Sequence, residues 1–497
     1  MDVTRAEVAT SAAAGVAGVA GSFAAAGRTP AFVAAPLASA LVNAAPGEVT
    51  TAVVQNLGEF GHTLALTVAL VLSVGVFAAI ALGATRVGSR SEVPYTAVLA
   101  AGLGGWLFAL AVARAPETAL WSAVPVGGVV AVAERGFAVG RRRPVSRTRR
   151  QTLAAVGALA GFLGVAGYRG RNITGAEPGP ISDVTDAETQ SEAEQLLGLA
   201  AERSLDVPEL APLVTEIGGF YEVDINGVNP NLSDGRWELS VTGAVEESFS
   251  LDYAELTEMV ESIEHRFVTL RCVGEGLNGK KMDTALWTGV PVSRLLERAG
   301  VPESSTCCVM LRAADGYYEE FPLAALEDGF LAFGMNGRRL PRAHGYPVRA
   351  LVPGHWGEIN VKWLTEIEVL KEEQEGYWEK RGWHGTGPVE TVAKLHTVEK
   401  LDDGKIRLGG HAYAGTRGIQ RVEISTDGQA TWQDATLSEP LPGEDVWRQW
   451  TYEWQAEPGE HEVVVRATDG TGTLQPESFS QPYPSGPTGW VSRTVDN

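Results

Sequence analysis

The sequence predicts three parts: an N-terminal all-α membrane bundle, a central α+β domain and a C-terminal all-β sandwich. Three observations predict this order: residues 1–171 are rich in long apolar stretches, residues 211–375 mix strand-like segments with short helices, and residues 385–497 hold closely spaced strands. At 497 residues, the chain is too long for one ordinary core. Residues 172–210 are polar and acidic, and we expect them to form a linker with one helix.

Five apolar stretches are long enough for membrane-spanning helices. They are residues 5–26, 62–84, 95–113, 118–139 and 152–168. Gly and Ala dominate them, which favours close packing of helices in lipid. The piece AFVAAPLASALVNAA is shorter and broken by proline, so we expect it to be interfacial or re-entrant.

Charge is divided between the two halves of the chain. Residues 1–171 contain 14 arginines, no lysine and 7 acidic residues, a formal charge of 14 − 7 = +7. The remainder contains 26 basic and 54 acidic residues, a formal charge of 26 − 54 = −28, which argues against a nucleic acid partner. Such an acidic, lysine-poor composition indicates a salt-loving source (a halophile), with an ordinary acidic protein as the alternative.

The arginines of the first half predict an orientation. They follow the second apolar stretch and gather between the fourth and the fifth, and cytoplasmic loops are enriched in such residues. We therefore expect a multi-pass cell-membrane protein whose acidic half is extracytoplasmic. The segment TRRQTL, Thr148 to Leu153, is similar to a twin-arginine export signal, with a plain positive-inside cluster as the alternative. The apolar stretches contain one histidine, His62, so no haem is predicted there, because a membrane haem usually needs two axial ligands.

The acidic half changes texture near residue 385. Before it, WELSVTGAV and RFVTLRCV are typical of strands, and VSRLLERAG is typical of a helix that ends at Gly300. After it, KIRLGGHAY, QRVEISTDG, WRQWTYEW and HEVVVRATD alternate at short spacing, which is typical of an immunoglobulin-like sandwich. A sandwich alone indicates a binding or dimerisation module.

The stretch RCVGEGLNGK has two interpretations. Its glycines fit the G-x-G-x-x-G of a dinucleotide-binding turn, but KKMDTALWTGVP follows where an apolar helix is required. Cys272, at a strand end beside these glycines, fits a buried structural thiol, a nucleophile or a metal ligand. The chain has three cysteines, too few for a disulfide framework, and we expect the adjacent Cys307 and Cys308 to fill a buried strand. One sulfur excludes zinc and iron–sulfur sites and leaves a metal that brings its own ligands.

Longer segments carry a specific resemblance. TLRCVGEGLNG…ALWTGVPVSRLLERAGV and FGMNGRRLPRAHGYPVRALVPGHWGEINVKWLTEIEV resemble the molybdenum-cofactor domain of the sulfite oxidase family. RVEISTDGQATWQDATL resembles the family's immunoglobulin-like dimerisation domain, which implies a homodimer. The resemblance covers about residues 215–495. It implies one pyranopterin, whose dithiolene gives molybdenum two sulfurs, and Cys272 as the protein's own molybdenum ligand.

The same resemblance implies the other site residues. Besides Cys272, Tyr317 and Arg417 fall on catalytic positions. Positions for the pterin and its phosphate are Tyr221, Asp224, Asn226, Asp315, His344, Arg349, Asn360, Val361 and Lys362. Arg and Lys side chains suit a buried phosphate.

Two departures from the family concern the substrate. The family surrounds sulfite with arginines, but Asp224 and the loop containing Glu275 occupy two of their positions, and Arg417 matches the third. Replacing cations in a buried pocket weakens binding of a dianion, so we expect oxygen-atom transfer with a neutral S-oxide or N-oxide. A true sulfite dehydrogenase is the alternative, and a non-enzymatic surface binding module is the second. With no haem motif predicted, we expect a separate electron-transfer partner such as a membrane cytochrome.

Overall fold

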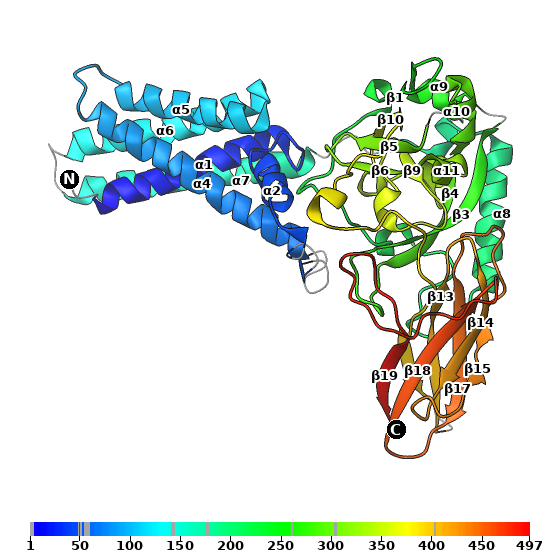
Figure 1. The fold of residues 1–497 in the computed structure, drawn as a ribbon. Helices are drawn as coiled ribbons and strands as arrows, with labels where there is room; N and C mark the ends of the chain where they lie inside the picture. Colours follow the sequence, from blue (N-terminus) through cyan, green and yellow to red (C-terminus); the bar gives the residue numbers. More distant parts are fainter. Residues whose placement is uncertain are drawn as a thin grey trace. The chain divides into compact units, whose positions relative to one another are not determined.

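The computed structural model describes residues 4–47, 49, 52–53, 60–140, 145–173, 178–259, 262–302, 306–401 and 404–497 (Figure 1). Contacts divide the chain into two compact units. The helical unit comprises Met1–Ala45, Glu59–Glu177 and Asp224–Asn231. The mixed unit comprises Pro46–Gly58, Pro178–Val223 and Leu232–Asn497.

The helical unit has six described helices. They are α1 (Arg5–Ala26), α2 (Ala34–Asn43), α4 (Phe60–Gly88), α5 (Thr96–Ala113), α6 (Pro116–Gly140) and α7 (Val145–Asn172). Four of them contain segments long and apolar enough to cross a membrane: Glu7–Ala26, Thr63–Gly88, Thr96–Ala113 and Pro116–Glu134. These four match the first four predicted stretches, and the short α2 matches the predicted interfacial piece. The fifth stretch forms part of α7.

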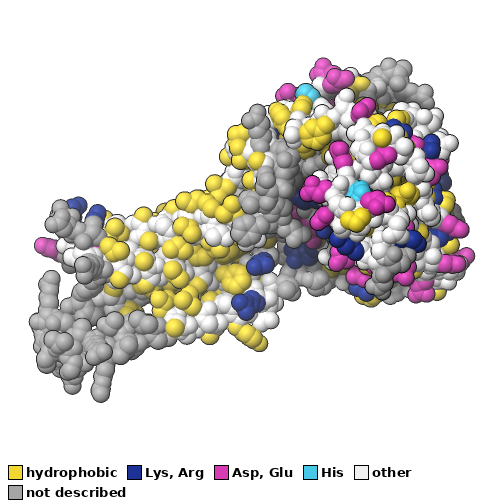
Figure 2. Space-filling model, turned by 90° about the horizontal axis from the view of Figure 1, so that it is seen from below, with side chains coloured by type: hydrophobic (Ala, Val, Ile, Leu, Met, Phe, Trp, Pro, Cys, Tyr) yellow, Lys and Arg dark blue, Asp and Glu magenta, His cyan; other side chains and the backbone are white. Residues whose placement is uncertain are grey.

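The helices pack through small residues and expose large ones. On α5, Ala97, Ala101, Gly105 and Ala109 are buried, whereas Leu99, Leu103 and Leu107 are 68%, 60% and 52% exposed. Figure 2 shows hydrophobic side chains over the surface of these helices. A surface of this kind suits lipid, where small residues let helix backbones approach closely and apolar side chains face the acyl chains.

The predicted export signal belongs to α7. Its backbone is helical from Val145, but the side chains of residues 145–158 lie outside the described part of the structure, as do residues 141–144. The side chain of His62 also lies outside it. The twin-arginine motif therefore stays a prediction.

The central part of the mixed unit contains two five-stranded sheets. One has the order β2-β1-β10-β5-β6, and the other has the order β3-β4-β7-β8 with β9 beside β7. The first sheet consists of β1 (Glu238–Gly243), β2 (Phe249–Asp252), β5 (Cys308–Ala313), β6 (Tyr318–Pro322) and β10 (Leu364–Leu370). The second consists of β3 (Glu264–Arg271), β4 (Met282–Pro291), β7 (Phe330–Met335), β8 (Arg338–Arg339) and β9 (Arg349–Leu351).

Apolar side chains from both sheets share one core. Val241 of β1 and Ile367 of β10 belong to the same buried cluster as Phe333 of β7. Three short helices cap the sheets: α9 (Tyr253–Thr257), α10 (Ser293–Ala299) and α11 (Leu323–Glu327). The predicted helix end is confirmed, because Gly300 caps α10 with a φ of 63°, a conformation that favours glycine. The α+β prediction holds for this part.

The C-terminal part is a β-sandwich with its own core. Its first sheet contains β11 (Val392–Ala393), β12 (Thr397–Lys400), β13 (Lys405–Tyr413), β16 (Thr436–Leu437) and β17 (Arg448–Gln455). The second contains β14 (Ile419–Ser425), β15 (Gln433–Asp434), β18 (Glu460–Asp469) and β19 (Val491–Asp496). The four strands predicted here correspond to β13, β14, β17 and β18. Ile406, Ile424 and Val463 from both sheets meet in the core.

Part of the predicted linker is packed against the mixed unit. Residues 178–210 contain η1 (Ile181–Asp183) and α8 (Ala187–Arg203). Asp186 caps α8 by accepting a hydrogen bond from the Thr189 N–H at 2.8 Å. Ala193 and Ala200 are buried in the same cluster as Phe267 of β3. The segment therefore behaves as part of the fold from residue 178 onward.

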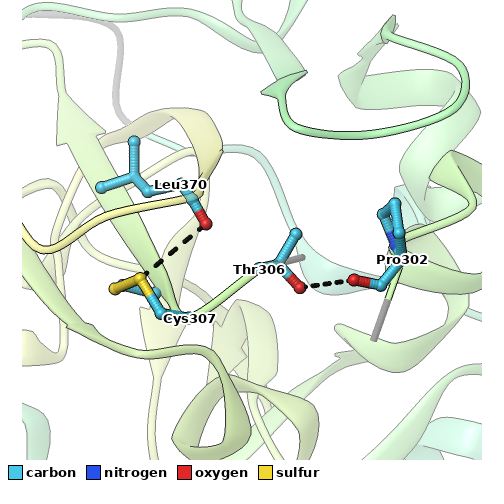
Figure 3. Close-up of a disulfide and its surroundings, with 5 residues drawn as sticks. Pro302, Thr306, Cys307 and Leu370 are labelled. Carbon is cyan, nitrogen blue, oxygen red and sulfur yellow. Dashed lines mark hydrogen bonds between the residues drawn. A yellow bond between two sulfur atoms is a disulfide. The ribbon is translucent and has the colours of Figure 1, made fainter. Parts of the chain in front are cut away.

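The prediction for the paired cysteines was wrong. Cys307 and Cys308 form a disulfide with each other (Figure 3). Cys308 begins β5 and is buried, whereas Cys307 is exposed, so only one of the two belongs to the core. Cys307 precedes the strand, so its side chain stays outside the core although its sulfur is bonded to that of Cys308. Cys272 is the free cysteine of the described chain.

Candidate functional site

Cys272 follows directly after β3. Its N–H donates to the Lys281 carbonyl at 3.0 Å, and its side chain is buried, with 8% of the residue exposed. Burial, followed by the nearby charge of Glu275, raises the pKa of the Cys272 thiol to about 11. A thiol in this place stays protonated unless a strong cation stabilises the thiolate, as a bound metal does.

The glycine loop after Cys272 is closed by a buried ion pair. Lys394 pairs with the Glu275 carboxylate and donates to the Gly279 carbonyl at 2.8 Å. Both side chains are buried, and burial lowers the pKa of Lys394. Asn278 adds two hydrogen bonds with the backbone of Leu395, at 2.9 and 2.8 Å. The loop is therefore fixed by the C-terminal domain and does not open a helix, which excludes the dinucleotide interpretation.

A cationic cluster lies at β9 and the segment after η6 (Gly357–Ile359). Arg349 is buried and donates to the carbonyls of His344 and Asn360 at 3.2 and 2.9 Å. Its Nε has no hydrogen-bond partner, and no carboxylate of the described residues pairs with it. Lys362 donates to the Ala343 carbonyl at 3.0 Å. A buried guanidinium without a counter-ion suits an anionic group such as a phosphate.

His344 lies beside these cations as a neutral imidazole. Burial, with the charges of Arg349 and Lys362, lowers the pKa of His344 to about 4. Its Nε2 is 3.3 Å from the Ile217 carbonyl, and its ring packs edge-on against Phe220 at 5.4 Å. A neutral imidazole can both donate and accept hydrogen bonds, as recognition of a polar ring system requires.

The next turn connects this cluster to Cys272. Asn360 is buried, accepts a hydrogen bond from the Val352 N–H at 2.7 Å and donates to the Trp356 carbonyl at 3.0 Å. Val361 is buried beside it and accepts a backbone hydrogen bond from Ala350 at 2.9 Å. A Cβ added at Gly357 would lie 2.8 Å from the Tyr221 hydroxyl and 3.1 Å from the Arg271 carbonyl. The turn therefore lies close to the end of β3.

Tyr221 completes this side of the site. Its N–H donates to the Asp283 carboxylate at 2.9 Å, and its ring stacks on Phe220. Burial, followed by the charge of a Cys272 thiolate, raises the pKa of the Tyr221 phenol. The Tyr221 phenol and the Cys272 thiol are close enough that a thiolate at Cys272 would disfavour a phenolate at Tyr221.

Tyr317 contacts η6 through the carbonyl of Glu358. Its hydroxyl donates to the Glu319 carboxylate at 2.8 Å and to the Glu358 carbonyl at 2.9 Å. Asp315 accepts a hydrogen bond from the Tyr317 N–H at 3.0 Å, which orients the start of β6. Burial, followed by the charge of Glu319, raises the pKa of the Tyr317 phenol. Tyr317 is therefore held as a neutral donor.

Three predicted residues are placed differently. Asp224 and Asn226 belong to Asp224–Asn231, which groups with the helical unit, and the Asn226 N–H contacts Asp224 Oδ1 at 3.3 Å. Arg417 lies in the C-terminal domain, where its Nε donates to Asp469 at 2.9 Å and its Nη2 donates to the Val389 carbonyl at 2.9 Å. The guanidinium of Arg417 is thus already paired with a carboxylate.

Four functional candidates escaped sequence reasoning. Glu319, Glu358 and Glu379 gather near Tyr317, and Lys394 pairs with Glu275. Glutamates are common on surfaces, and Lys394 is 119 residues from Glu275, so neither composition nor spacing marks them. Glu319 carried one available signal: it lies two residues from Tyr317, on the same face of the strand.

The fold and the site together define a cofactor-binding oxidoreductase. The family described as "Oxidoreductase molybdopterin binding domain" matches residues 226–378, and the family described as "Mo-co oxidoreductase dimerisation domain" matches residues 388–483. The buried Cys272 thiol and the unpaired Arg349 Nε fit such a cofactor, the first as a metal ligand and the second as a phosphate donor. The chain belongs to the sulfite oxidase family of molybdopterin-dependent oxidoreductases.

Several curated proteins are similar to this chain. It is 31% identical to mitochondrial sulfite oxidase of Homo sapiens over 309 residues, which are 50% of this chain and 55% of that protein. It is 29% identical to sulfite oxidase of Gallus gallus over 302 residues, 50% of this chain and 66% of that protein. Nitrate reductase [NADH] of Solanum lycopersicum is 27% identical over 328 residues, 52% of this chain and 36% of that protein. The chain thus spans about half the length of the curated relatives it matches.

A solved structure shares the fold. The sulfane dehydrogenase SoxCD from Paracoccus pantotrophus matches with a TM-score of 0.50 and 21% identity, over 58% of this chain and 82% of that chain. This likeness concerns the fold alone.

Proposed function

We propose that this chain is a membrane-anchored, extracytoplasmic molybdenum oxidoreductase that transfers an oxygen atom to or from an uncharged S-oxide or N-oxide. One observation carries the choice of substrate: carboxyl groups of Glu275, Glu319 and Glu358 lie around Cys272 and Tyr317, and the buried cation beside Cys272, Arg271, donates to the backbone carbonyls of Glu390 and Pro487. Glu275 is neutralised by Lys394, and Glu319 and Glu358 lie beside Tyr317. In neither protonation state do these groups supply the positive charge that a sulfite dianion requires.

The chain's own residues have separate tasks in this proposal. When bound through Cys272, the molybdenum cofactor supplies the site that exchanges the oxygen atom and two electrons. Arg349 and Lys362 would hold its phosphate, and His344, Asn360, Val361, Tyr221 and Asp315 would surround the pterin or shape its pocket. The Tyr317 hydroxyl would donate to the substrate oxygen after turning away from Glu319. The buried position of Cys272 keeps bulk water from competing for the metal.

The N-terminal half anchors the enzyme in this proposal. Four apolar helices and the outward-facing leucines of α5 support a membrane location. In this proposal the arginine-rich loops are cytoplasmic, and the mixed unit lies outside the cytoplasm and exchanges electrons with a separate partner such as a membrane cytochrome. Export is testable by replacing both Arg149 and Arg150 with Lys, which we expect to retain the mixed unit inside the cell. Unchanged display outside would reduce TRRQTL to a charge cluster.

The substrate test uses purified, molybdenum-loaded full-length protein under anaerobic conditions. Sulfite is assayed with an electron acceptor, and methionine sulfoxide and trimethylamine N-oxide are assayed with an electron donor. We expect turnover of at least one oxide and weak turnover of sulfite. Strong sulfite oxidation with no oxide reduction would establish a sulfite dehydrogenase instead.

A further inference from the structure

Three glutamate side chains meet below Tyr317. Glu319 lies on β6 and is fully buried, Glu358 lies on η6, and Glu379 lies on η7 (Glu379–Arg381). Both carboxylate oxygens of Glu358 and of Glu379 are buried and have no hydrogen-bond partner, and neither has Glu319 Oε1. An ionised carboxylate in such a place would lose its hydration without replacement.

Two glycines make room for these carboxyl groups. A Cβ added at Gly376 would overlap Glu319 Oε1 and Glu379 Oε2. A Cβ added at Gly385 would overlap Glu358 Oε1 and lie 2.9 Å from a Val273 methyl carbon, next to Cys272 in the chain. The missing side chains of Gly376 and Gly385 thus leave space for three carboxyl groups, one of them beside Val273, the residue after Cys272.

The cluster holds protons and is not arranged for a metal ion. Among the described residues, no group of three or more His, Cys, Asp or Glu side chains has an arrangement that could hold a metal. Glu319 Oε1 and Glu379 Oε2 both lie against the point where a Cβ of Gly376 would stand, so these two buried carboxyl groups are close together, and like charges at such a site favour a protonated form. Burial, followed by Glu379 and Glu358, raises the pKa of Glu319, and burial raises the pKa of Glu358.

Tyr317 connects this store to the site. Its hydroxyl is 2.8 Å from Glu319 Oε2, and its second acceptor, the Glu358 carbonyl, belongs to the turn whose Gly357 faces Tyr221 and Arg271. The Trp378 N–H, at 3.4 Å, also points at Glu319 Oε2. The phenol therefore lies between the Glu319 carboxyl group and η6, whose Gly357 is close to Tyr221 and the end of β3.

We propose that Glu319, protonated beside the buried carboxyl groups of Glu358 and Glu379, is a positioning residue that supplies protons through the Tyr317 hydroxyl to the oxygen released at the site. The proposal rests on the proposed function, because reduction of an S-oxide or N-oxide consumes two electrons and two protons and releases water. In the step itself, a protonated Glu319 donates to the Tyr317 oxygen, the reverse of the hydrogen bond in the structure, and the Tyr317 O–H bond breaks as the substrate oxygen gains a proton. The Glu319 O–H bond then breaks as the phenol re-forms, and no electron moves between these groups.

Other titratable groups face the same cluster. Glu358 approaches from η6 and Asp315 from the turn before β6. From the segment around η7, the Tyr377 ring lies 5.4 Å from the Tyr317 ring, and the Arg381 guanidinium lies 3.7 Å above Tyr377. Arg381 and Asp315 act on Tyr377 in opposite directions, and the charges that act most strongly on Glu319 are those of Glu358 and Glu379.

The first test uses cofactor-free full-length protein, and Glu319→Gln is the variant. Infrared difference spectra in H2O and D2O report the carbonyl band of a protonated carboxyl group. We expect this band in the wild type at a pH above the pKa of Glu320, and we expect it to lose intensity in Glu319→Gln. Glu320→Gln is the matched control, because Glu320 neighbours Glu319 on β6 and burial raises its pKa to about 7. The control should keep the band.

The second test uses molybdenum-loaded protein. We expect Glu319→Gln to reduce oxide turnover by about tenfold to a hundredfold and to flatten its pH profile, with an unchanged KM, as for loss of a proton donor. Glu379→Gln should shift the same profile, which keeps the test decisive if Glu319→Gln folds poorly. Glu320→Gln should retain the wild-type profile.

The outcomes separate this inference from the proposed function. A carboxyl band of unchanged intensity in Glu319→Gln, or pH profiles of Glu319→Gln and Glu379→Gln that equal the wild type, would overturn the proton store. If the band loses intensity as expected but the wild type turns over no oxide, the proton store stands and the substrate proposal fails.

Discussion

Two clusters of ionisable side chains lie near η6, the turn that begins at Gly357. One consists of basic groups and the other of carboxyl groups. On one side, Arg349 and Lys362 point their charges at backbone carbonyls, and Arg349 has no carboxylate partner. On the other side, Glu319, Glu358 and Glu379 gather around Tyr317. The difference teaches that each cluster keeps unsatisfied buried atoms, Arg349 Nε in the first and carboxyl oxygens in the second. In the proposed function, the first would meet an anionic group of the cofactor and the second would hold protons.

A third buried charge shows what a complete pair is like. Lys394 and Glu275 neutralise each other inside the loop after Cys272. Their pairing holds the loop and leaves nothing for a ligand. We therefore regard the Lys394–Glu275 pair as structural and expect ligand binding or proton transfer at the two clusters that keep unsatisfied atoms.

Replacing Cys272, the residue proposed as the metal ligand, should have the largest effect. Cys272→Ser should abolish molybdenum binding, because a hydroxyl is a poor substitute for a thiolate on a soft metal. The measurement is the molybdenum-to-protein ratio of folded, purified protein. A double variant of Cys307 and Cys308 to Ser is the control and should retain the metal. Molybdenum in folded Cys272→Ser would exclude this cysteine as the ligand.

Breaking the complete pair should have the next largest effect. Lys394→Met leaves the Glu275 carboxylate buried without a partner, which should lower the free energy of unfolding by about 3–5 kcal/mol. Adding Glu275→Gln should restore much of this loss, since no charge is then left unpaired. Chemical denaturation monitored by tryptophan fluorescence measures both variants. Equal stability of Lys394→Met and wild type would contradict the ion pair.

Removing the cationic cluster should act on cofactor retention. Arg349→Ala should weaken retention by about 30-fold, or ~2 kcal/mol, the strength of one charge-assisted hydrogen bond. Arg349→Lys should restore part of this loss because it keeps the charge but not the planar donor. Molybdenum content after dialysis is the measurement. Full retention by Arg349→Ala would remove the phosphate role.

The acidic cluster should have the smallest effect and one that depends on pH. Because the pKa of Glu358 is raised, its carboxyl group is neutral below that pKa and charged above it. Glu358→Gln should therefore lower the KM for sulfite by about tenfold at high pH, ~1.4 kcal/mol of relieved repulsion, and leave it unchanged at low pH. The KM for a neutral oxide is the internal control. An equal change at both ends of the pH range would contradict the charge argument.

Sequence reasoning succeeded where local pattern decides structure. Apolar length predicted five membrane-type helices, of which four match apolar spans of the described structure, and alternation predicted β13, β14, β17 and β18. Resemblance, and not pattern, led to the cofactor and to Cys272. The roles assigned to Tyr317, Arg417 and the pterin-binding positions stay predictions.

What sequence reasoning missed depends on contacts between distant segments. Glu319, Glu358 and Glu379 lie on three elements that only the fold brings together, and each alone resembles a surface glutamate. Cys307 and Cys308 misled for the opposite reason. Their apolar surroundings predicted that both side chains are buried. Cys307, however, lies before β5 and is exposed, and its sulfur is bonded to that of the buried Cys308.

Helix α8 has a mechanical consequence. Near its start, the Thr189 carbonyl contacts His265 Nε2 of β3 at 2.7 Å. At its end, Arg203 binds the Pro440 carbonyl, and the Leu205 N–H donates to Gln449 of β17 at 2.7 Å. A pull transmitted along the chain into residue 178 is therefore divided between the central domain and the sandwich. The hydrogen bonds at the two ends of α8 thus spread a force on residue 178 over two parts of the mixed unit.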